Sequence, residues 1–175
     1  MLENKKILLI ITSSIAAYKS LFLIRILKEN NALVNVVMTE SAKKFITPLS
    51  ISSLSEKKVY ENIFDLTDES EMGHIKLAKM HDLIIIAPAS ANFISKIACG
   101  LADDLASTIL LASKSSVIFV PAMNVVMQNN EIIKSNIKTL KNNGYKFLFG
   151  ESGDLACGDY GIGRMSEPSN ILKFI

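Results

Sequence analysis

KKILLIIT, residues 5–12, is a continuous apolar run that leads into residues 15–29, where apolar side chains recur at helical spacing. Ala17, Leu21 and Ile24 mark the apolar positions of that second stretch. A strand that reads as an unbroken apolar run is typical of a parallel sheet, because helices cover both of its faces. The pair therefore predicts an α/β fold with buried central strands.

The same alternation of strand and helix patterns continues along the chain. Further strands are predicted over residues 33–38, 83–87, 117–120 and 145–149, and helices over residues 48–54, 74–80, 91–99, 104–112 and 130–142. Pro88 and Pro121 are expected to stop the third and fourth strands, and residues 65–71 to form a polar surface loop. Alternation without repeats or Gly/Ser-rich linkers predicts one domain, residues 1–175, with a three-layer α/β/α, Rossmann-like (flavodoxin-like) parallel sheet. Ligands of such sheets bind beyond the carboxyl ends of the strands.

The composition is that of an ordinary globular protein. Of the 175 residues, 49% are apolar and 21% are charged, and the net charge of +2 comes without a basic cluster. These values argue against disorder and against a nucleic-acid partner. The N-terminal apolar run is too short for a membrane span and lacks a signal-peptide cleavage region. Cys99 and Cys157 show neither a disulfide scaffold nor metal-ligand spacing, so we expect a cytoplasmic protein without a metal site.

Polar residues follow the predicted strands. Ser13 and Ser14 join the first strand to the first helix, where free backbone N–H groups favour a phosphate. Plain N-capping explains the two serines equally well, because neither a Gly-x-Gly-x-x-Gly nor a Walker pattern is present. Asn92 in PASAN and Asn124 in PAMN each follow a strand-ending proline. Either one alone indicates an Asx turn or an N-cap, but the repeated design favours a ligand's carboxylate or polar ring edge.

Residues 150–165, GESGDLACGDYGIGRM, are the least ordinary segment. They contain five of the eight glycines, with Cys157 and Arg164 between them. This composition indicates either a mobile flap over a substrate or a flexible connection to the last helix. Cys99, inside a helical apolar pattern, is interpreted as a small apolar residue.

The two histidines give weaker signals. His74 follows a glycine and opens an amphipathic helix. A lone histidine is more often structural or solvated than catalytic, so the residue pattern leaves its role open. His81, directly before a buried strand, is interpreted as a surface turn residue.

Together these motifs resemble the homo-oligomeric flavin-containing cysteine decarboxylases, and among them the phosphopantothenoylcysteine (PPC) decarboxylases. The matching segments run in family order over nearly the whole chain. They are residues 15–19 (IAAYK), 38–40 (MTE), 45–48 (FITP), 73–75 (GHI), 77–78 (LA), 88–92 (PASAN), 104–108 (DLAST), 121–124 (PAMN), Met127, 156–158 (ACG) and 163–165 (GRM).

The resemblance implies an FMN-dependent decarboxylation of 4'-phospho-N-pantothenoylcysteine to 4'-phosphopantetheine and CO2, a step of coenzyme A biosynthesis. It implies that His74 assists oxidation of the substrate, that Asn124 holds the leaving carboxylate and that Cys157 donates a proton. The residues implied to contact substrate are Asn124, Met127, Arg164 and Met165, and those implied to surround FMN are Ser13, Ser14, Thr39, Ser53, Ala89, Ser90, Asn92, Ser107 and Thr108. It also implies a homotrimer, or a dodecamer built of trimers, with FMN between subunits.

The chain departs from the family pattern in three places. Ser13 and Ser14 stand where relatives usually have glycines, which requires that neither serine needs a positive φ. Gln128 follows Met127 in place of a frequent aromatic residue. The chain ends at Ile175, and the resemblance then predicts a stand-alone decarboxylase without the ligating domain of many bacterial relatives.

Two alternatives stay open. A peptidyl-cysteine decarboxylase would share the flavin, His74 and Asn124, but the segment around Cys157 and Gly-Arg-Met favours the enzyme that reduces its product. A catalytically idle flavin-binding regulator would work by contacting a partner protein. The joint presence of His74, Asn124 and Cys157 argues against a regulator.

Overall fold

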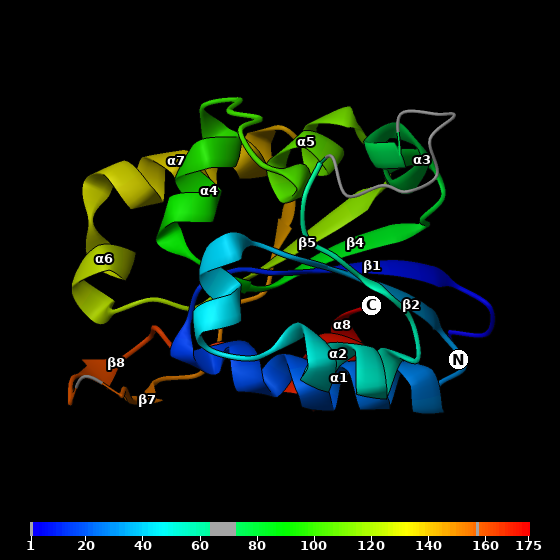
Figure 1. Ribbon diagram of the computed structural model, residues 1–175. Coiled ribbons are helices and arrows are strands. Elements are labelled where there is room, and N and C mark those ends of the chain that lie inside the picture. The colour runs from blue at the N-terminus through cyan, green and yellow to red at the C-terminus, as the bar shows by residue number, and fades with distance from the viewer. Residues whose placement is uncertain (1, 64–72, 157) are drawn as a thin grey trace.

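The computed structural model describes residues 2–63, 73–156 and 158–175, and within them a six-stranded parallel sheet lies between two layers of helices (Figure 1). The strands are β1 (Lys6–Ile11), β2 (Leu33–Met38), β3 (Val59–Tyr60), β4 (Leu83–Ala89), β5 (Ser116–Pro121) and β6 (Lys146–Phe147). Their order in the sheet is β3-β2-β1-β4-β5-β6, with every pair parallel. This is the Rossmann strand order and differs from the flavodoxin order. The parallel sheet between two layers of helices (Figure 1) confirms the predicted three-layer α/β/α architecture.

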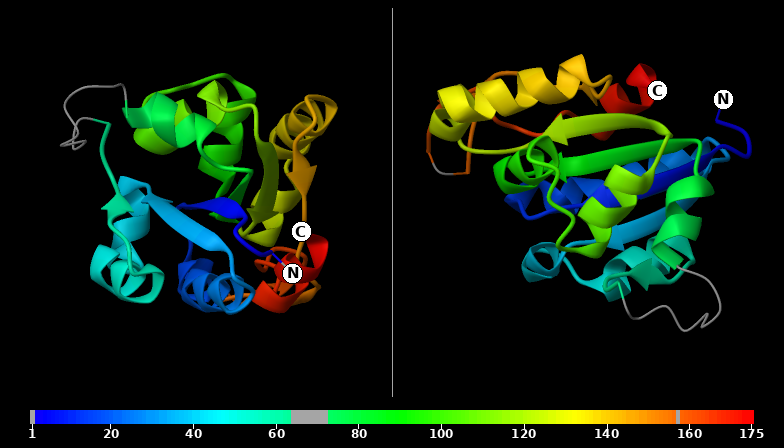
Figure 2. Two further views of the ribbon diagram at one scale, coloured as in Figure 1. Left: turned by 90° about the vertical axis from the view of Figure 1, so that its right-hand side faces the viewer. Right: turned by 90° about the horizontal axis from the view of Figure 1, so that it is seen from above.

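Helices cover both faces of the sheet (Figure 2). One face carries α1 (Tyr18–Glu29), α2 (Pro48–Ser55) and α8 (Pro168–Phe174), and the other carries α3 (Gly73–Lys79), α4 (Ala91–Ala98), α5 (Leu105–Ala112) and α7 (Glu131–Asn142). The shorter elements are η1 (Ile15–Ala17), η2 (Glu40–Lys44), α6 (Val125–Asn129) and the antiparallel pair β7 (Gly153–Asp154) and β8 (Tyr160–Gly161). No helix in the described part of the chain is long and apolar enough to cross a membrane.

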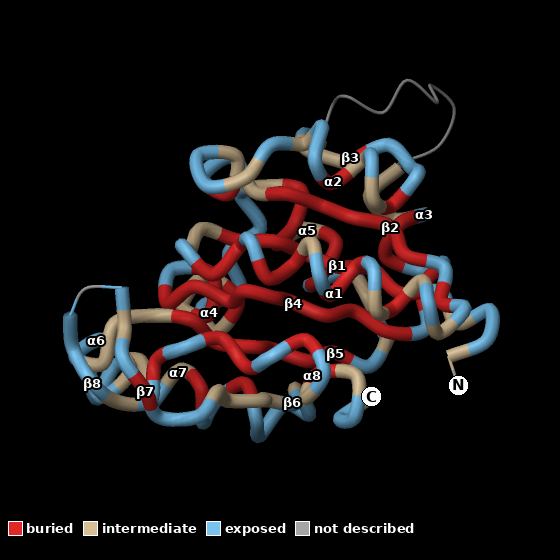
Figure 3. The backbone as a smooth tube through the Cα atoms, turned by 90° about the horizontal axis from the view of Figure 1, so that it is seen from below, coloured by how far each residue is buried: buried red, intermediate tan, exposed pale blue. Residues whose placement is uncertain are grey.

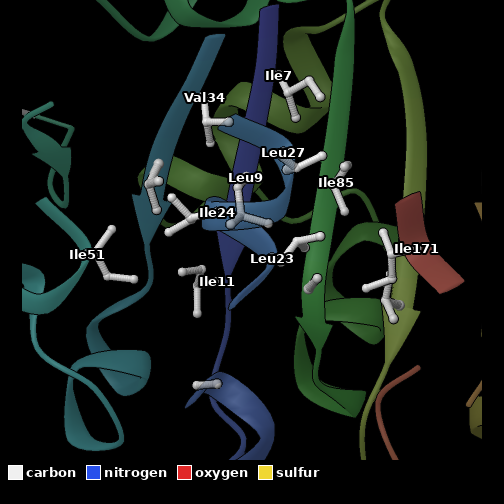
Figure 4. Close-up of a cluster of buried hydrophobic side chains, with 14 of the residues drawn as sticks. Ile7, Leu9, Ile11, Leu23, Ile24, Leu27, Val34, Ile51, Ile85 and Ile171 are labelled. Atoms are coloured by element: carbon white, nitrogen blue, oxygen red, sulfur yellow. The ribbon is translucent and has the colours of Figure 1, made fainter. Parts of the chain in front are cut away.

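The strand that indicated the fold lies at the centre of the core. Residues 7–11 of β1 are fully buried, and β1 and β4 are buried along most of their length (Figure 3). Ile7, Leu9 and Ile11 point into the cluster formed with α1, α2 and α8 (Figure 4), whereas Leu8 and Ile10 point into the opposite cluster. Each face therefore needs apolar residues, which explains the unbroken apolar run.

The prediction that Pro88 ends its strand was wrong. β4 continues to Ala89, which pairs with Pro121 of β5 after a shift of register. Proline has no N–H, but its carbonyl can still bond to a neighbouring strand. The Pro88 carbonyl accepts from the backbone N–H of Thr12 at 3.3 Å and from its Oγ1 at 2.7 Å.

Two other interpretations were wrong. His81 is 4% exposed, because the turn before β4 directs its ring inward instead of to the surface. The ring lies between the side-chain amide of Asn35 and the carbonyl of Leu77. Cys99 is exposed at the C-terminal cap of α4 and is not a buried apolar residue. The polar segment 65–71 lies outside the described residues.

Candidate functional site

The carboxyl ends of β1 and β4 mark the point where the strand order reverses, and a crevice is expected there. Thr12, which sequence reasoning gave no role, is 1% exposed at this point. Its Oγ1 donates to the Pro88 carbonyl at 2.7 Å and accepts from the Ser90 N–H at 2.9 Å. These bonds hold the loop after β4 against the end of β1, beside the Ser13–Ser14 turn.

The Ser13–Ser14 turn has a backbone that serine adopts readily. Ser14 has φ −166° and caps η1, with its Oγ accepting from the Ala16 N–H at 3.2 Å. Positive φ occurs at no described serine. Neither serine therefore occupies a conformation that would require glycine. The N-cap is confirmed at Ser14, and a phosphate at this turn stays a prediction.

Further polar groups stand along the same edge. Thr39 follows β2, Ser90 caps α4, and Asn92 lies exposed in the first turn of α4. Ala89 is fully buried, so only its backbone could reach a ligand. No group of three or more metal-ligating side chains occurs among the residues described. Hydroxyls, amides and a helix start suit a phosphorylated, hydroxyl-rich cofactor such as FMN.

Three other residues implied to bind flavin have hydroxyls that bond to their own helices. Ser53 is exposed, and its Oγ donates to the backbone of α2 at 2.8 Å. Ser107 is fully buried, with its N–H and Oγ each 2.8 Å from Asp104 Oδ1, and Thr108 Oγ1 donates to the Asp104 carbonyl at 2.7 Å. Burial alone would raise the pKa of Asp104, but hydrogen bonds from Ser107 and Lys96 outweigh it and lower the pKa. These contacts build the start of α5, and a role at the flavin stays a prediction.

A cavity of about 340 Å³ opens beyond the ends of β1 and β5, where α1 begins and α6 and the β7–β8 pair lie (Figure 1). Four of the predicted site residues line it, namely Ser14, Asn124, Arg164 and Met165. Lys19 and Asp154 line it as well. Met127 is exposed on α6 and is not part of this wall. Cys157 lies outside the described residues, directly after Ala156 of the cavity lining.

Asn124 combines the two roles that its sequence pattern left open. Its Oδ1 accepts from the N–H groups of Val126 at 2.7 Å and Met127 at 3.2 Å, so it caps α6. Only the amide oxygen can accept, and the cap therefore decides which way the amide is turned. The nitrogen Nδ2, a donor only, bonds to Asp159 Oδ2 at 3.0 Å. Asn124 thus presents to this cavity an amide donor that suits a carboxylate.

Lys19 belongs to the same cavity and is 6% exposed. Its Nζ donates to Glu167 Oε1 at 2.6 Å and to the Met165 carbonyl at 3.2 Å. The ion pair fastens α1 to the segment after β8 and so holds one wall of the cavity. Met165 and Glu167 follow Lys19 in the chain by 146 and 148 residues. No local pattern could have indicated this contact.

The described part of residues 150–165 forms the β7–β8 pair and packs against PAMN. The Met123 N–H donates to the Gly163 carbonyl at 3.0 Å. A Cβ at position 163 would collide with the Met123 carbonyl oxygen, and a Cβ at position 150 would collide with the Arg164 carbonyl oxygen. Gly150 and Gly163 are therefore needed for close approach of the backbone, which argues against a flexible connection, and a role in covering a substrate stays a prediction.

His74 lies apart from these residues. It is half-buried in α3, which ends at Lys79, shortly before β4 begins. Figure 1 shows α3 toward the side where the strands start, whereas α6 and the β7–β8 pair lie beyond their carboxyl ends. The views of Figure 2 agree with this separation. A single chain therefore does not bring His74 and Asn124 together.

Comparisons with known proteins agree with the predicted resemblance. A family model described as Flavoprotein matches residues 1–175. The coenzyme A biosynthesis bifunctional protein CoaBC of Haemophilus influenzae is 46% identical over 171 residues, which cover 98% of this chain and 43% of that protein. The chain thus spans less than half the length of the curated relatives it matches.

Solved structures show the same fold. A mutant PPC decarboxylase complexed with pantothenoylaminoethenethiol has a TM-score of 0.87 and 33% identity, covering 98% of this chain and 96% of its own. The FMN binding protein AtHal3 has a TM-score of 0.85 and 33% identity, covering 98% of this chain and 95% of its own.

Proposed function

Because this chain belongs to the flavoprotein family, we propose that it binds FMN and decarboxylates 4'-phospho-N-pantothenoylcysteine to 4'-phosphopantetheine and CO2. The relative named for coenzyme A biosynthesis, the PPC decarboxylase structure and the FMN binding protein support this substrate and cofactor. The observation that carries the proposal is the Asn124 amide. Its oxygen is held by the N–H groups of α6, and its nitrogen Nδ2, at the wall of the cavity, donates to the Asp159 carboxylate, which shows that this position suits a carboxylate.

The polar edge beyond β1, β2 and β4 would hold the cofactor. In this proposal Ser13 and Ser14 bind its phosphate, while Thr39, Ser90 and Asn92 contact its other polar groups. Bound FMN would supply the two-electron oxidant and reductant that the thiol-bearing carbon of the substrate needs. A β-thiol carboxylate needs this help, because the carbanion left by CO2 has no electron sink, whereas the C=S group of an oxidised substrate can accept the electron pair.

The protein's own residues position the substrate and move protons. Asn124 donates to the substrate's carboxylate and orients it until CO2 leaves. Arg164, on the same cavity wall, adds a positive charge that favours an anionic substrate. Cys157 supplies the proton that completes the product, since a thiol's pKa of about 8.5 is readily tuned for proton transfer.

A second copy of the chain would supply His74. Within one chain α3 and α6 lie at different ends of the sheet (Figure 1), so a histidine that acts beside Asn124 has to come from a neighbour. Ile15, Tyr18 and Phe22 are exposed by 62%, 50% and 54% at the start of α1, beside the cavity, and provide an apolar surface for contact. We therefore propose a homotrimer, or a dodecamer of trimers, with FMN between subunits. Mass measurement in solution tests this assembly, and a monomer that retains activity would contradict it.

The activity is tested on purified protein. It should be yellow and should release CO2 from PPC, with 4'-phosphopantetheine identified by mass spectrometry. Flavin colour without turnover would instead favour the regulator, and turnover of a peptide ending in cysteine would favour the peptidyl-cysteine enzyme.

We further propose that residues 1–175 act as one domain and that the protein works in the cytoplasm.

A further inference from the structure

The donor that Asn124 presents to the cavity is already bonded to a carboxylate of the protein itself. Asp159 lies just before β8, and its Oδ2 accepts from Asn124 Nδ2 at 3.0 Å. We propose that Asp159 holds the place of the substrate's carboxylate, so that the substrate must displace Asp159 to bind Asn124. This inference rests on the proposed function, because it takes Asn124 as the group that binds the leaving carboxylate.

The chemistry of the amide makes the two carboxylates competitors. Asn124 Oδ1 is occupied by the N–H groups of Val126 and Met127, so the side chain cannot turn over without uncapping α6. Nδ2 only donates, and it carries two N–H groups, one of which bonds to Asp159 Oδ2. A substrate carboxylate that binds this nitrogen would therefore lie directly beside the Asp159 carboxylate. The two anions would repel each other, so binding of the substrate displaces Asp159.

The backbone around Asp159 presents its side chain to Asn124. The Leu155 N–H donates to the Asp159 carbonyl at 2.8 Å, and Asp154 pairs with Tyr160 across the β7–β8 pair. These bonds use main-chain groups, so the hairpin keeps its place when the carboxylate leaves Asn124. Asp159 is exposed, and its displaced charge can turn into water without the cost of burial.

Displacement would distinguish substrate from product. PPC carries a carboxylate that binds Asn124 at the expense of Asp159, whereas 4'-phosphopantetheine has none. Once CO2 has left, Asp159 can bond to Asn124 again and the next carboxylate must compete anew. Asp159 is thus a positioning and specificity-determining residue that weakens binding of the carboxylated compound alone.

The test measures binding of two unreactive compounds to the FMN-loaded protein by calorimetry. One is the serine counterpart of PPC, whose hydroxyl cannot form a C=S group, and the other is the same compound without its carboxyl group. Asp159→Ala should bind the serine compound roughly three- to tenfold more tightly than wild type, because an exposed charge-assisted hydrogen bond is a modest competitor. The compound without a carboxyl group should bind with unchanged affinity.

Two further variants separate competition at Asn124 from a general effect of removing a negative charge. Asp159→Asn keeps the shape but not the charge and should give an intermediate gain. Glu151→Ala removes an equally exposed acid from the same segment and should match wild type for both compounds. Equal or weaker binding of the serine compound to both Asp159 variants, in a protein that releases CO2 from PPC, would overturn this inference alone. Wild-type protein that neither releases CO2 nor distinguishes the two compounds would overturn the proposed function together with it.

Discussion

Lowering the pH from 7 to 5 should destabilise the protein through His81, the buried histidine before β4. Its Nδ1 lies 2.8 Å from the Leu77 carbonyl oxygen, and its Nε2 lies 2.7 Å from Asn35 Nδ2. A carbonyl only accepts and an amide nitrogen only donates, so Nδ1 carries the proton and Nε2 keeps its lone pair. The neutral ring satisfies both partners. A second proton on Nε2 would face the amide protons of Asn35.

The size of the effect follows from the two states of the ring. Burial lowers the pKa of His81 in the folded protein, whereas the ring in the unfolded chain titrates near 6.5. Because the folded pKa is the lower one, the unfolded chain takes up the proton first, and stability is lost as the pH falls below about 6.5. If the folded ring stays neutral down to pH 5, the loss between pH 7 and pH 5 is about 2 kcal/mol.

Urea unfolding at pH 7, 6 and 5, at fixed protein and flavin concentrations, measures this loss. His81→Gln cannot titrate, so its free energy of unfolding should fall by about 2 kcal/mol less over this range than that of wild type. His74→Gln is the matched control, because the chain contains only two histidines and His74 is only half-buried. It should keep most of the wild-type pH dependence. If His81→Gln retained that dependence in full, the assignment of a neutral, buried ring would be refuted.

Four substitutions test the site. Cys157→Ser should still release CO2 but accumulate the oxidised ene-thiol, which mass spectrometry detects; normal product would remove Cys157 from the mechanism. His74→Asn should remain folded and yellow while losing substrate oxidation, measured as flavin bleaching under anaerobic conditions, and undiminished bleaching would leave it a structural residue. Asn124→Asp keeps the cap on α6 but places a negative charge beside the substrate's carboxylate, so kcat/KM for PPC should fall roughly 100-fold or more, equivalent to about 3 kcal/mol, while the urea midpoint falls only modestly, because the new charge faces the exposed Asp159. Gly163→Ala should cost about 1–3 kcal/mol in the free energy of unfolding, because its Cβ would collide with the Met123 carbonyl; a midpoint equal to that of wild type would show that the close approach is unnecessary.

Long, strongly patterned elements could be predicted from the sequence, whereas most short ones could not; β6, of two residues, lies within the strand predicted over residues 145–149. The apolar runs of β1, β2 and β4 and the periodic helices were predicted at nearly their observed bounds. β3 and the β7–β8 pair have strands of two residues each, and α6 has five. Such lengths carry no measurable periodicity, and contacts with distant residues decide their conformation. The burial of His81 was not predicted for the same reason, because it depends on contact with Asn35 in another strand.

The candidate site was predicted only as a set of separate segments. Strand ends in a parallel sheet share one edge, so Ser14 and Asn124 could be expected near each other before the structure was known. The Lys19–Glu167 ion pair and the Thr12 bridge could not, because their partners are far away in the chain. The separation of His74 from Asn124 could not be predicted either, since local spacing says nothing about where α3 lies relative to α6.

KKILLIIT thus determined by itself that the central strand is buried on both faces, because an unbroken apolar run is unstable wherever one face meets water. The polar residues after the strands likewise predicted which edge of the sheet would carry ligands. Only the tertiary structure decided how Asn124 is used. The N–H groups of α6 hold its oxygen and the Asp159 carboxylate accepts from its nitrogen, and both partners reach it through the packing of segments that the sequence keeps apart.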